Sequence, residues 1–410
     1  MVGQRSHQTH RYGGGRKVAA PNVTLFVVAF LLAACTPVSV TNASTSSTTT
    51  TTTAPVTDTT SEYWPTEGWR TAAPEEQGMD SHLLADLFAA IDEESYAIDS
   101  VTVIRNGYVV ADGVVHPFGK ESRHIIHSCT KSIVSALIGI AVEEGYLEGV
   151  EQAVLDILPD REIANLDADK EAMTLENVLT MSTGLDCRDS YLYGWRGLSE
   201  MRASDDWVQH MLDLPMVAPP GSLFEYCNGG SFLLSAILQE VTEMKAADFA
   251  RDRLFGPLGI TDFVWPESPQ GINIGWGELR MRPHDLAKIG YLYLRDGRWE
   301  NRQVVPSTWV DASTHSHIGG TLQDGYGYQW WVRDDGVYMA LGYAGQYLIV
   351  VPAHDLVVVF TSDLPEDEFY LPQSLLDNYI IPAVLSEGAL PADPEGKAAL
   401  RAATEALATP

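Results

Sequence analysis

The residues of this chain best suited to chemistry are Ser128 and Lys131, in the segment Ser-Cys-Thr-Lys that opens an apolar helical pattern. A serine hydroxyl is a poor nucleophile at neutral pH and needs a base beside it. Residues three apart share one face of a helix, so this spacing brings the Lys131 amine next to the Ser128 hydroxyl. The N–H groups at a helix N-terminus can also stabilise an oxyanion. Alone, the four residues fit a serine N-cap followed by a solvated lysine better than a catalytic pair.

Two further motifs follow along the chain. Tyr226-Cys227-Asn228 precedes a second apolar run, and Gly342-Tyr-Ala-Gly-Gln346 lies between two strand-like runs.

The three motifs in this order resemble those of the serine β-lactamase and penicillin-binding protein superfamily, and most closely its class C branch of esterases, amide hydrolases and D-amino-acid peptidases. That branch carries Ser-x-x-Lys, then Tyr-x-Asn, then Lys-Thr-Gly or a His-x-Gly variant. The resemblance runs from about residue 64 to about residue 385 and includes connecting phrases such as Leu-Thr-Met-Ser-Thr-Gly-Leu at 179–185. It implies an α/β (α+β) fold in which both chain ends build one antiparallel sheet with flanking helices, and a mainly helical subdomain is inserted between them.

The resemblance also implies roles for these residues. Ser128 would attack a carbonyl carbon and form an acyl-enzyme that water hydrolyses, with Lys131 accepting or relaying the proton. Tyr226 resembles the family tyrosine that acts as general base or proton relay; its pKa of about 10 would have to be lowered by a nearby cation, for which Lys131 is the candidate. The alternative for Tyr226 is a packed aromatic side chain. Asn228 would orient Lys131 and the substrate amide. The backbone N–H groups of Ser128 and Gln346 would form the oxyanion hole.

The third motif departs from the superfamily pattern. Tyr343 replaces the lysine of Lys-Thr-Gly and Ala344 replaces the threonine, while Gly345 is retained, which is expected to let a substrate lie close along the strand. β-Lactams and peptidoglycan stems carry a carboxylate that this lysine helps to bind. Small esters and neutral amides are therefore the expected substrates, and Tyr343 can still donate a hydrogen bond to them.

Three functions are compatible with these motifs. The first, which we favour, is a serine hydrolase acting on small esters or amides. The second is a D-amino-acid peptidase or β-lactamase acting on cell-wall-type substrates, which Arg188 or Arg280 would favour by reaching the cleft. The third is an acylated sensor or wall-binding module without turnover, against which the complete set of catalytic motifs argues. No Gly-x-Ser-x-Gly elbow occurs, so an α/β-hydrolase is excluded.

Aromatic residues are candidates for lining the substrate cleft, although most fit core packing equally well, and one or two are expected to touch substrate. The candidates are Tyr191, Tyr193, Trp195, Trp276, Trp330 and Trp331. His127 precedes Ser128, and adjacent residues on a helix point in different directions. We therefore interpret His127 as a packing histidine rather than a member of a catalytic triad.

The N-terminal residues 1–35 have the pattern of a lipoprotein-type signal peptide. Four basic residues precede an apolar core of about 12 residues, shorter than the roughly 20 needed to span a bilayer. Leu32-Ala-Ala-Cys35 resembles a bacterial lipobox, in which Cys35 is acylated and becomes the mature N-terminus; an ordinary cleaved signal with a chance cysteine is the alternative. The Ser/Thr-rich residues 36–62 are predicted to form a disordered linker. We expect an exported, extracytoplasmic protein anchored to the membrane by its lipid.

Composition limits the partners. The chain has 26 Lys and Arg against 55 Asp and Glu, a formal charge of −29, which argues against nucleic-acid binding and against polybasic docking on anionic lipid. No C-x-x-C or His-Cys cluster indicates a metal, and no cofactor is expected. The expected partner is a small-molecule ester or amide, and without any signal of oligomer formation we expect a monomer.

If Cys35 is lipidated, one disulfide at most can form; a Cys187–Cys227 bridge and two buried free thiols are equally open.

The resemblance implies a single domain, residues 63–385, and hydrophobic periodicity predicts its elements. Helices are predicted at 79–94, 130–144, 284–295 and 372–385, and strands at 100–104, 108–115, 336–341, 347–352 and 356–362. Asn106-Gly107 between the first two strands predicts a hairpin, and Gly145 is the expected C-cap of the Ser128 helix. Residues from about 146 to 300 read as a helical insert, and 386–410 as a weakly ordered tail.

Overall fold

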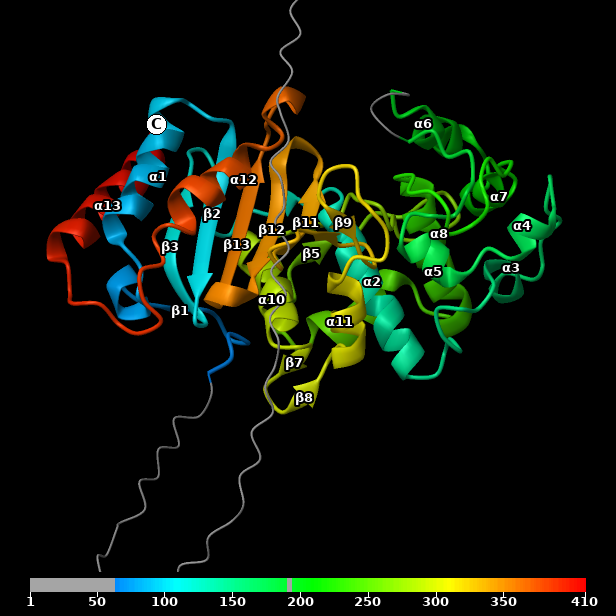
Figure 1. The fold of residues 1–410 in the computed structure, drawn as a ribbon, viewed down its shortest axis with the longest axis horizontal. Coiled ribbons are helices and arrows are strands. Elements are labelled where there is room, and N and C mark those ends of the chain that lie inside the picture. The colour runs from blue at the N-terminus through cyan, green and yellow to red at the C-terminus, as the bar shows by residue number, and fades with distance from the viewer. Residues whose placement is uncertain (1–62, 190–193) are drawn as a thin grey trace, which may run out of the picture. The chain divides into compact units, whose positions relative to one another are not determined.

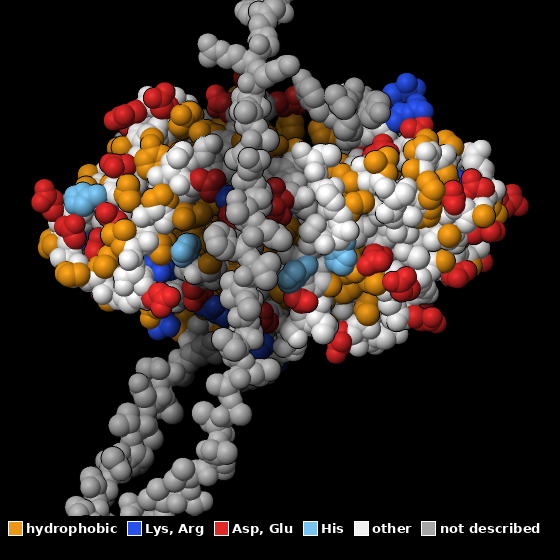
Figure 2. Space-filling view, in the orientation of Figure 1, with side chains coloured by type: hydrophobic (Ala, Val, Ile, Leu, Met, Phe, Trp, Pro, Cys, Tyr) orange, Lys and Arg blue, Asp and Glu red, His pale blue; other side chains and the backbone are white. Residues whose placement is uncertain are grey.

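A computed structural model describes residues 63–189 and 194–410, which belong to one compact unit, Thr60–Pro410. The predicted signal peptide, Cys35 and the linker lie outside the described residues, as do Tyr191 and Tyr193. Figure 1 shows the arrangement of helices and strands, and Figure 2 shows acidic side chains scattered over the visible face with few Lys and Arg among them. This scatter fits a solvated acidic surface.

An eight-stranded sheet forms the centre of the described unit, in the order β1-β3-β2-β13-β12-β11-β10-β9. Its strands are β1 (Arg70–Thr71), β2 (Ile98–Arg105), β3 (Tyr108–Val114), β9 (Gly325–Tyr326), β10 (Trp331–Val332), β11 (Tyr338–Gly342), β12 (Gln346–Val351) and β13 (Leu356–Ser362). All neighbours pair antiparallel except β1 with β3. Because β13 pairs with β2 along its length, both chain ends build the sheet, as predicted.

Helices cover both faces of this sheet (Figure 1). On one face lie α2 (Cys129–Glu143) and α10 (Pro283–Leu294); on the other lie α1 (Ser81–Glu93), α12 (Leu371–Leu375) with the π-helical turn η7 (Leu376–Ile380), and α13 (Pro394–Leu407). The central strands β12 and β13 are buried along their whole length. This double burial explains their continuous Val, Ile and Leu runs in place of alternation.

The remaining elements are short, apart from α8. Between α2 and α10 lie α3 (Val154–Ile157), α4 (Ala168–Glu171), α5 (Leu175–Leu179), α6 (Arg196–Ala203), α7 (Trp207–Leu212), α8 (Asn228–Thr242), α9 (Ala246–Ala250) and the π-helical turn η3 (Arg251–Phe255). A small sheet joins β4 (His124–Ile125), β6 (Arg280–Met281) and β5 (Phe263–Val264); β7 (Arg298–Trp299) pairs with β8 (Arg302–Gln303), and α11 (Ser307–Thr314) follows. Among the described residues, no helix combines the length and apolarity needed to cross a bilayer.

The hairpin predicted at Asn106-Gly107 is present. Arg105 pairs with Tyr108 across the turn, and φ is +52° at Asn106 and +79° at Gly107. Two successive positive φ angles match the twist of the flanking strands, which is why Asn-Gly is favoured there. Gly145, with φ +79°, ends the Ser128 helix as expected.

Two boundaries differ from the prediction. Helix α10 packs on the large sheet, since a Cβ at Gly290 would lie 2.7 Å from Leu348 and 2.8 Å from Val357. The helical insert therefore ends before α10 rather than near residue 300. The predicted C-terminal helix at 372–385 is shorter, because regular helical structure ends at Ile380.

The expectation of a weakly packed tail at 386–410 was wrong. Helix α13 is capped by Asp393, whose carboxylate accepts the N–H groups of Glu395 and Gly396, and it packs along α1. Its Leu400 and Leu407 are buried. The tail is rich in Ala and Glu, both strong helix formers, and the two leucines, one heptad apart, supply the apolar stripe that holds it.

Candidate active site

The nucleophile candidate Ser128 is the residue that starts α2. Just before it, His127 has φ +45°, a left-handed conformation that turns the chain from β4 into the helix. Every residue from Cys129 to Ala141 is buried, so α2 is enclosed on all sides. Lys131, one turn into this apolar helix, is only 2% exposed.

The amine of Lys131 has three polar neighbours. Its Nζ lies 2.9 Å from Ser128 Oγ, 2.8 Å from Asn228 Oδ1 and 2.8 Å from the Trp276 carbonyl oxygen. The two carbonyl oxygens can only accept hydrogen bonds. A neutral amine would use both of its hydrogens on them and direct its lone pair at Ser128, whose hydroxyl then donates. The arrangement is therefore that of a base poised to accept the serine proton.

Burial favours this neutral form. Loss of hydration lowers the pKa of Lys131 well below its usual value, and the nearby Asp189 carboxylate opposes that shift only in part. A free ammonium buried here would cost several kcal/mol, whereas neutralisation removes that cost.

Tyr226 lies beside the pair. Its ring centroid is 4.8 Å from Lys131 Nζ, its ring stacks on Trp331 at 6.0 Å, and it lines the same pocket as Ser128. Burial raises the pKa of Tyr226 above its usual value. The expected lowering of this pKa by Lys131 is therefore not found, because the lysine is itself disposed to be neutral. Tyr226 is placed as a phenol that relays a proton, not as a resting phenolate.

Asn228 is the first residue of α8, which packs along α2. Its backbone N–H donates to Asp189 Oδ2 at 2.9 Å, and the Leu198 N–H donates to the other oxygen of the same carboxylate. Asp189 is 1% exposed, and burial raises its pKa. Sequence reasoning missed Asp189; its position two residues after Cys187 was the available signal.

Cys187 and Cys227 form a disulfide, so of the two open alternatives the bridge is the one found. It ties the segment that carries Asp189 to the residue between Tyr226 and Asn228. Cys187, Asp189 and Cys227 are close enough to resemble a metal cluster. Both sulfurs are bonded to each other, however, and cannot act as thiolate ligands.

The third motif forms the tight turn η4 (Tyr343–Gly345) between β11 and β12. Ala344 has φ +57° and Gly345 has φ +82°. A Cβ at Gly345 would lie 2.4 Å from Ser362 Oγ and 2.6 Å from Leu364. The glycine is thus required by packing against the end of β13, and not by the approach of a substrate as expected from the sequence.

Of the residues near Gly345, Tyr343 lines the pocket, whereas the Gln346 side chain lies in the interior. Tyr343 is 50% exposed, lines the pocket and packs edge-on against His127, with ring centroids 5.6 Å apart. His127 is accordingly a packing residue whose pKa is lowered by burial. The Gln346 side chain is buried and donates to the Ser362 carbonyl, so only its backbone is available for the predicted oxyanion role.

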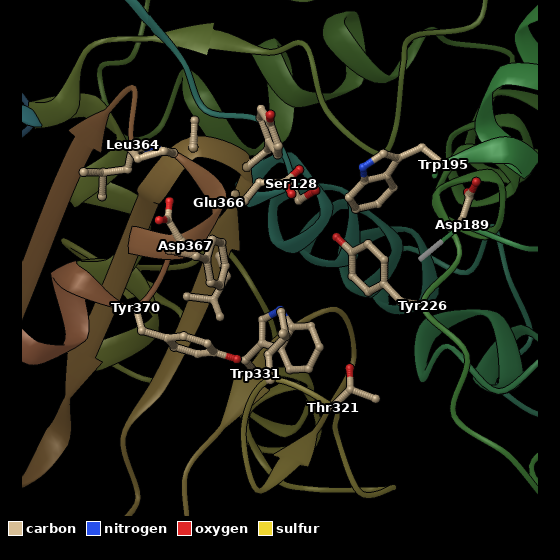
Figure 3. Close-up of a pocket in the computed structure, with 17 residues that line it drawn as sticks. Ser128, Asp189, Trp195, Tyr226, Thr321, Trp331, Leu364, Glu366, Asp367 and Tyr370 are labelled. Carbon is tan, nitrogen blue, oxygen red and sulfur yellow. The ribbon is translucent and has the colours of Figure 1, made fainter. Parts of the chain in front are cut away.

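A pocket of about 630 Å³ opens above Ser128 (Figure 3). Ser128, Asp189, Trp195 and Tyr226 lie on one side of it, and the segment that follows β13, including Leu364, Glu366, Asp367 and Tyr370, lies on the other. The lining is mostly apolar and, among the described residues, contains no Lys or Arg.

Only some of the residues expected in the cleft line this pocket. Trp195 and Trp331 line the pocket, Trp276 contributes its carbonyl to Lys131, and Trp330 packs in the core against Tyr293. Neither arginine considered for carboxylate recognition lines the pocket. Arg188 pairs with Asp186, and Arg280 lies in β6 beside a separate shallow pocket.

A serine in contact with a buried lysine one turn away, with a tyrosine beside the pair, is the arrangement of a serine hydrolase. The model of the Beta-lactamase family matches residues 84–374, and the chain belongs to that family.

Relatives in the family have several activities. The chain is 24% identical to the 6-aminohexanoate-dimer hydrolase of Paenarthrobacter ureafaciens over 310 residues, which cover 70% of this chain and 77% of the relative. It is 25% identical to penicillin-binding protein 4 of Amycolatopsis lactamdurans over 280 residues, 58% of this chain and 71% of the relative.

Solved structures share the fold at low identity. EstCE1, a hydrolase with promiscuous acyltransferase activity, superposes with a TM-score of 0.62 at 17% identity, covering 73% of this chain and 99% of that one. The octameric penicillin-binding protein homologue of Pyrococcus abyssi gives 0.56 at 20% identity, covering 72% and 77%. These likenesses confirm the β-lactamase/transpeptidase-like fold.

The lowered pKa of Lys131 predicts how activity depends on pH. Below that pKa the ammonium has no lone pair for the serine proton, so kcat/KM should rise with pH and level off below the range usual for lysine. Lys131→Arg, charged at all accessible pH, should lose at least about 100-fold throughout. The surface variant Lys120→Arg is the control and should match the wild type. A profile that falls as pH rises from 6 to 9 would contradict the base role.

The disulfide should support both stability and catalysis. The Cys187→Ser/Cys227→Ser variant should lose about 2–4 kcal/mol of unfolding free energy and also show a lower kcat, because Asp189 and Asn228 lose their common clamp. Denaturant unfolding and steady-state kinetics measure the two effects. Reductant should bring the wild type down to the level of the variant and leave the variant unchanged; an equal loss in both would argue against the bridge.

Proposed function

We propose that this chain hydrolyses small esters or amides without a required carboxylate, through an acyl-enzyme on Ser128. The observation that carries the proposal is the pocket lining, in which Tyr343 takes the place of the lysine of Lys-Thr-Gly and no described Lys or Arg compensates. A β-lactam or cell-wall peptide would have to bring its carboxylate into this pocket without a cationic partner there. An ester or neutral amide has no such requirement.

In the proposed reaction the Ser128 oxygen attacks the substrate carbonyl carbon and its proton passes to the Lys131 lone pair. The negative charge on the carbonyl oxygen is held by the backbone N–H groups of Ser128 and Gln346. Tyr226, whose ring lies beside Lys131, relays the proton to the leaving oxygen or nitrogen. Water then attacks the acyl-enzyme with the same groups in reverse order.

Matched substrates test this proposal. Residues 63–410 should hydrolyse a chromogenic short-chain ester and the corresponding anilide, and should turn over a chromogenic cephalosporin at least about 100-fold more slowly by kcat/KM. Ser128→Ala should abolish all turnover, and Ser132→Ala, which lies one turn away and bonds the Gln329 carbonyl, is the control for effects on the helix. Comparable rates on the cephalosporin would refute the substrate class.

The same assay addresses the sensor alternative. Intact-mass measurement during turnover should show an acyl group that disappears as substrate is consumed. An acyl group that persists on Ser128 without product release would replace the hydrolase by an acylated sensor. The cell-wall peptidase alternative gains no support from Arg188 or Arg280, since neither lines the pocket.

We also propose that residues 1–35 direct export and that Cys35 carries a lipid anchor. The Cys187–Cys227 bridge supports export, because disulfides persist in oxidising compartments. In bacteria, the full-length protein should partition into the detergent phase of Triton X-114, and Cys35→Ser should partition into the aqueous phase. Equal partition of the two would argue against lipidation at Cys35.

A further inference from the structure

The pocket above Ser128 combines carboxylates with exposed aromatic rings. We propose that the preferred substrate carries a cationic group, such as an ammonium, which binds against Glu366 and Asp367 at the far side of the pocket from Tyr226. This inference rests on the proposed hydrolysis at Ser128 and adds a specificity to it.

Glu366 and Asp367 belong to the short 3₁₀ turn η6 (Glu366–Glu368), which follows β13. Both line the pocket, and Figure 3 shows them across it from Trp195 and Tyr226. Both side chains are exposed, and within the described part of the chain neither forms an ion pair. Their negative charge is therefore available to a ligand.

The segment that carries these carboxylates is fixed on both sides. Before them, the Leu364 N–H donates to the Ala344 carbonyl at 3.0 Å, which joins the segment to the turn of the third motif. After them, the Tyr347 hydroxyl donates to the Phe369 carbonyl at 2.8 Å. The two acids thus sit at a defined position relative to Ser128, and little ordering is required when a substrate binds.

Aromatic side chains provide the second, independent feature. Tyr343 and Tyr370 line the pocket, with 50% and 47% of their surface exposed, and Phe369 and Trp331 line it as well. The face of an aromatic ring attracts a cation within about 6 Å, most strongly when the cation is weakly hydrated. Rings together with carboxylates form a lining suited to an alkylammonium group.

The same charges act against an anionic substrate. Asp189 is buried and accepts backbone N–H groups, so the carboxylates exposed to a bound molecule are those of Glu366 and Asp367, and no described Lys or Arg lines the pocket. The overall charge of −29 adds a long-range field of the same sign. A carboxylate on the substrate would meet repulsion here, and a cation would meet attraction.

Isosteric esters test the inference. Each pair is a nitrophenyl ester of an alkanoic acid ending either in trimethylammonium or in tert-butyl, which match in shape and differ in charge; chain lengths of three to six methylenes are compared. For residues 63–410 at low salt, kcat/KM should favour the cation by about tenfold at the best length. Added salt should reduce this preference.

Variants of the acidic residues in η6 test whether Glu366 and Asp367 cause the preference for the cationic ester. Glu366→Gln/Asp367→Asn should reduce the preference to within about twofold, and Glu368→Gln, which removes a charge from the same turn outside the pocket lining, should keep it. The ratio of the kcat/KM values for the two esters is unaffected by any loss of active protein. Thermal unfolding checks that the variants fold.

The experiment distinguishes a failure of this inference from a failure of the proposed function. If the tert-butyl esters are hydrolysed in a Ser128-dependent way and no chain length shows a preference for the cation, or the double variant retains the preference, the inference is overturned and the hydrolase stands. If no ester is turned over in a Ser128-dependent way, the proposed function fails and this specificity fails with it.

Discussion

The site depends on the burial of one amine. Lys131 is held between Ser128 Oγ and two carbonyl oxygens, in a helix whose surface is covered on all sides. A charged lysine in that place would lose its hydration, so burial favours the neutral form that can take a proton from serine. The packing of α8 and of the segment at Trp276 against α2 is therefore part of the catalytic chemistry, because it excludes water and supplies the two carbonyl acceptors.

A second constraint fixes the start of α8 relative to the segment that carries Cys187 and Asp189. The Cys187–Cys227 bridge and the Asp189 carboxylate both hold the start of α8, where Asn228 contacts Lys131. The bridge joins two cysteines that lie 40 residues apart in the sequence. The hydrogen bond from the Asn228 N–H to the Asp189 carboxylate joins the same two segments. Tyr226 precedes this clamp directly, so its hydroxyl is positioned by the same contacts that position the base.

Local patterns sufficed for much of the fold and for the contact between Ser128 and Lys131. The i, i+3 spacing placed Lys131 beside Ser128, and Asn106-Gly107 fixed a hairpin, because both effects act over a few residues. The role of Asp189, the packing reason for Gly345 and the docking of α13 depend on contacts between distant segments. The pKa of Tyr226 was misjudged for a similar reason: burial of the phenol itself raises that pKa, and burial cannot be read from a motif.

Direct titration of Lys131 tests the central claim most closely. In residues 63–410 labelled with ¹³C at lysine Cε, the signal that is missing from Lys131→Met identifies the residue, and its shift can be followed from pH 5 to 11. The account predicts a midpoint well below that of the surface lysines, which titrate near about 10.4. A Lys131 signal that titrates together with the surface lysines would show that the amine is charged in the resting enzyme, and would contradict its assignment as the base.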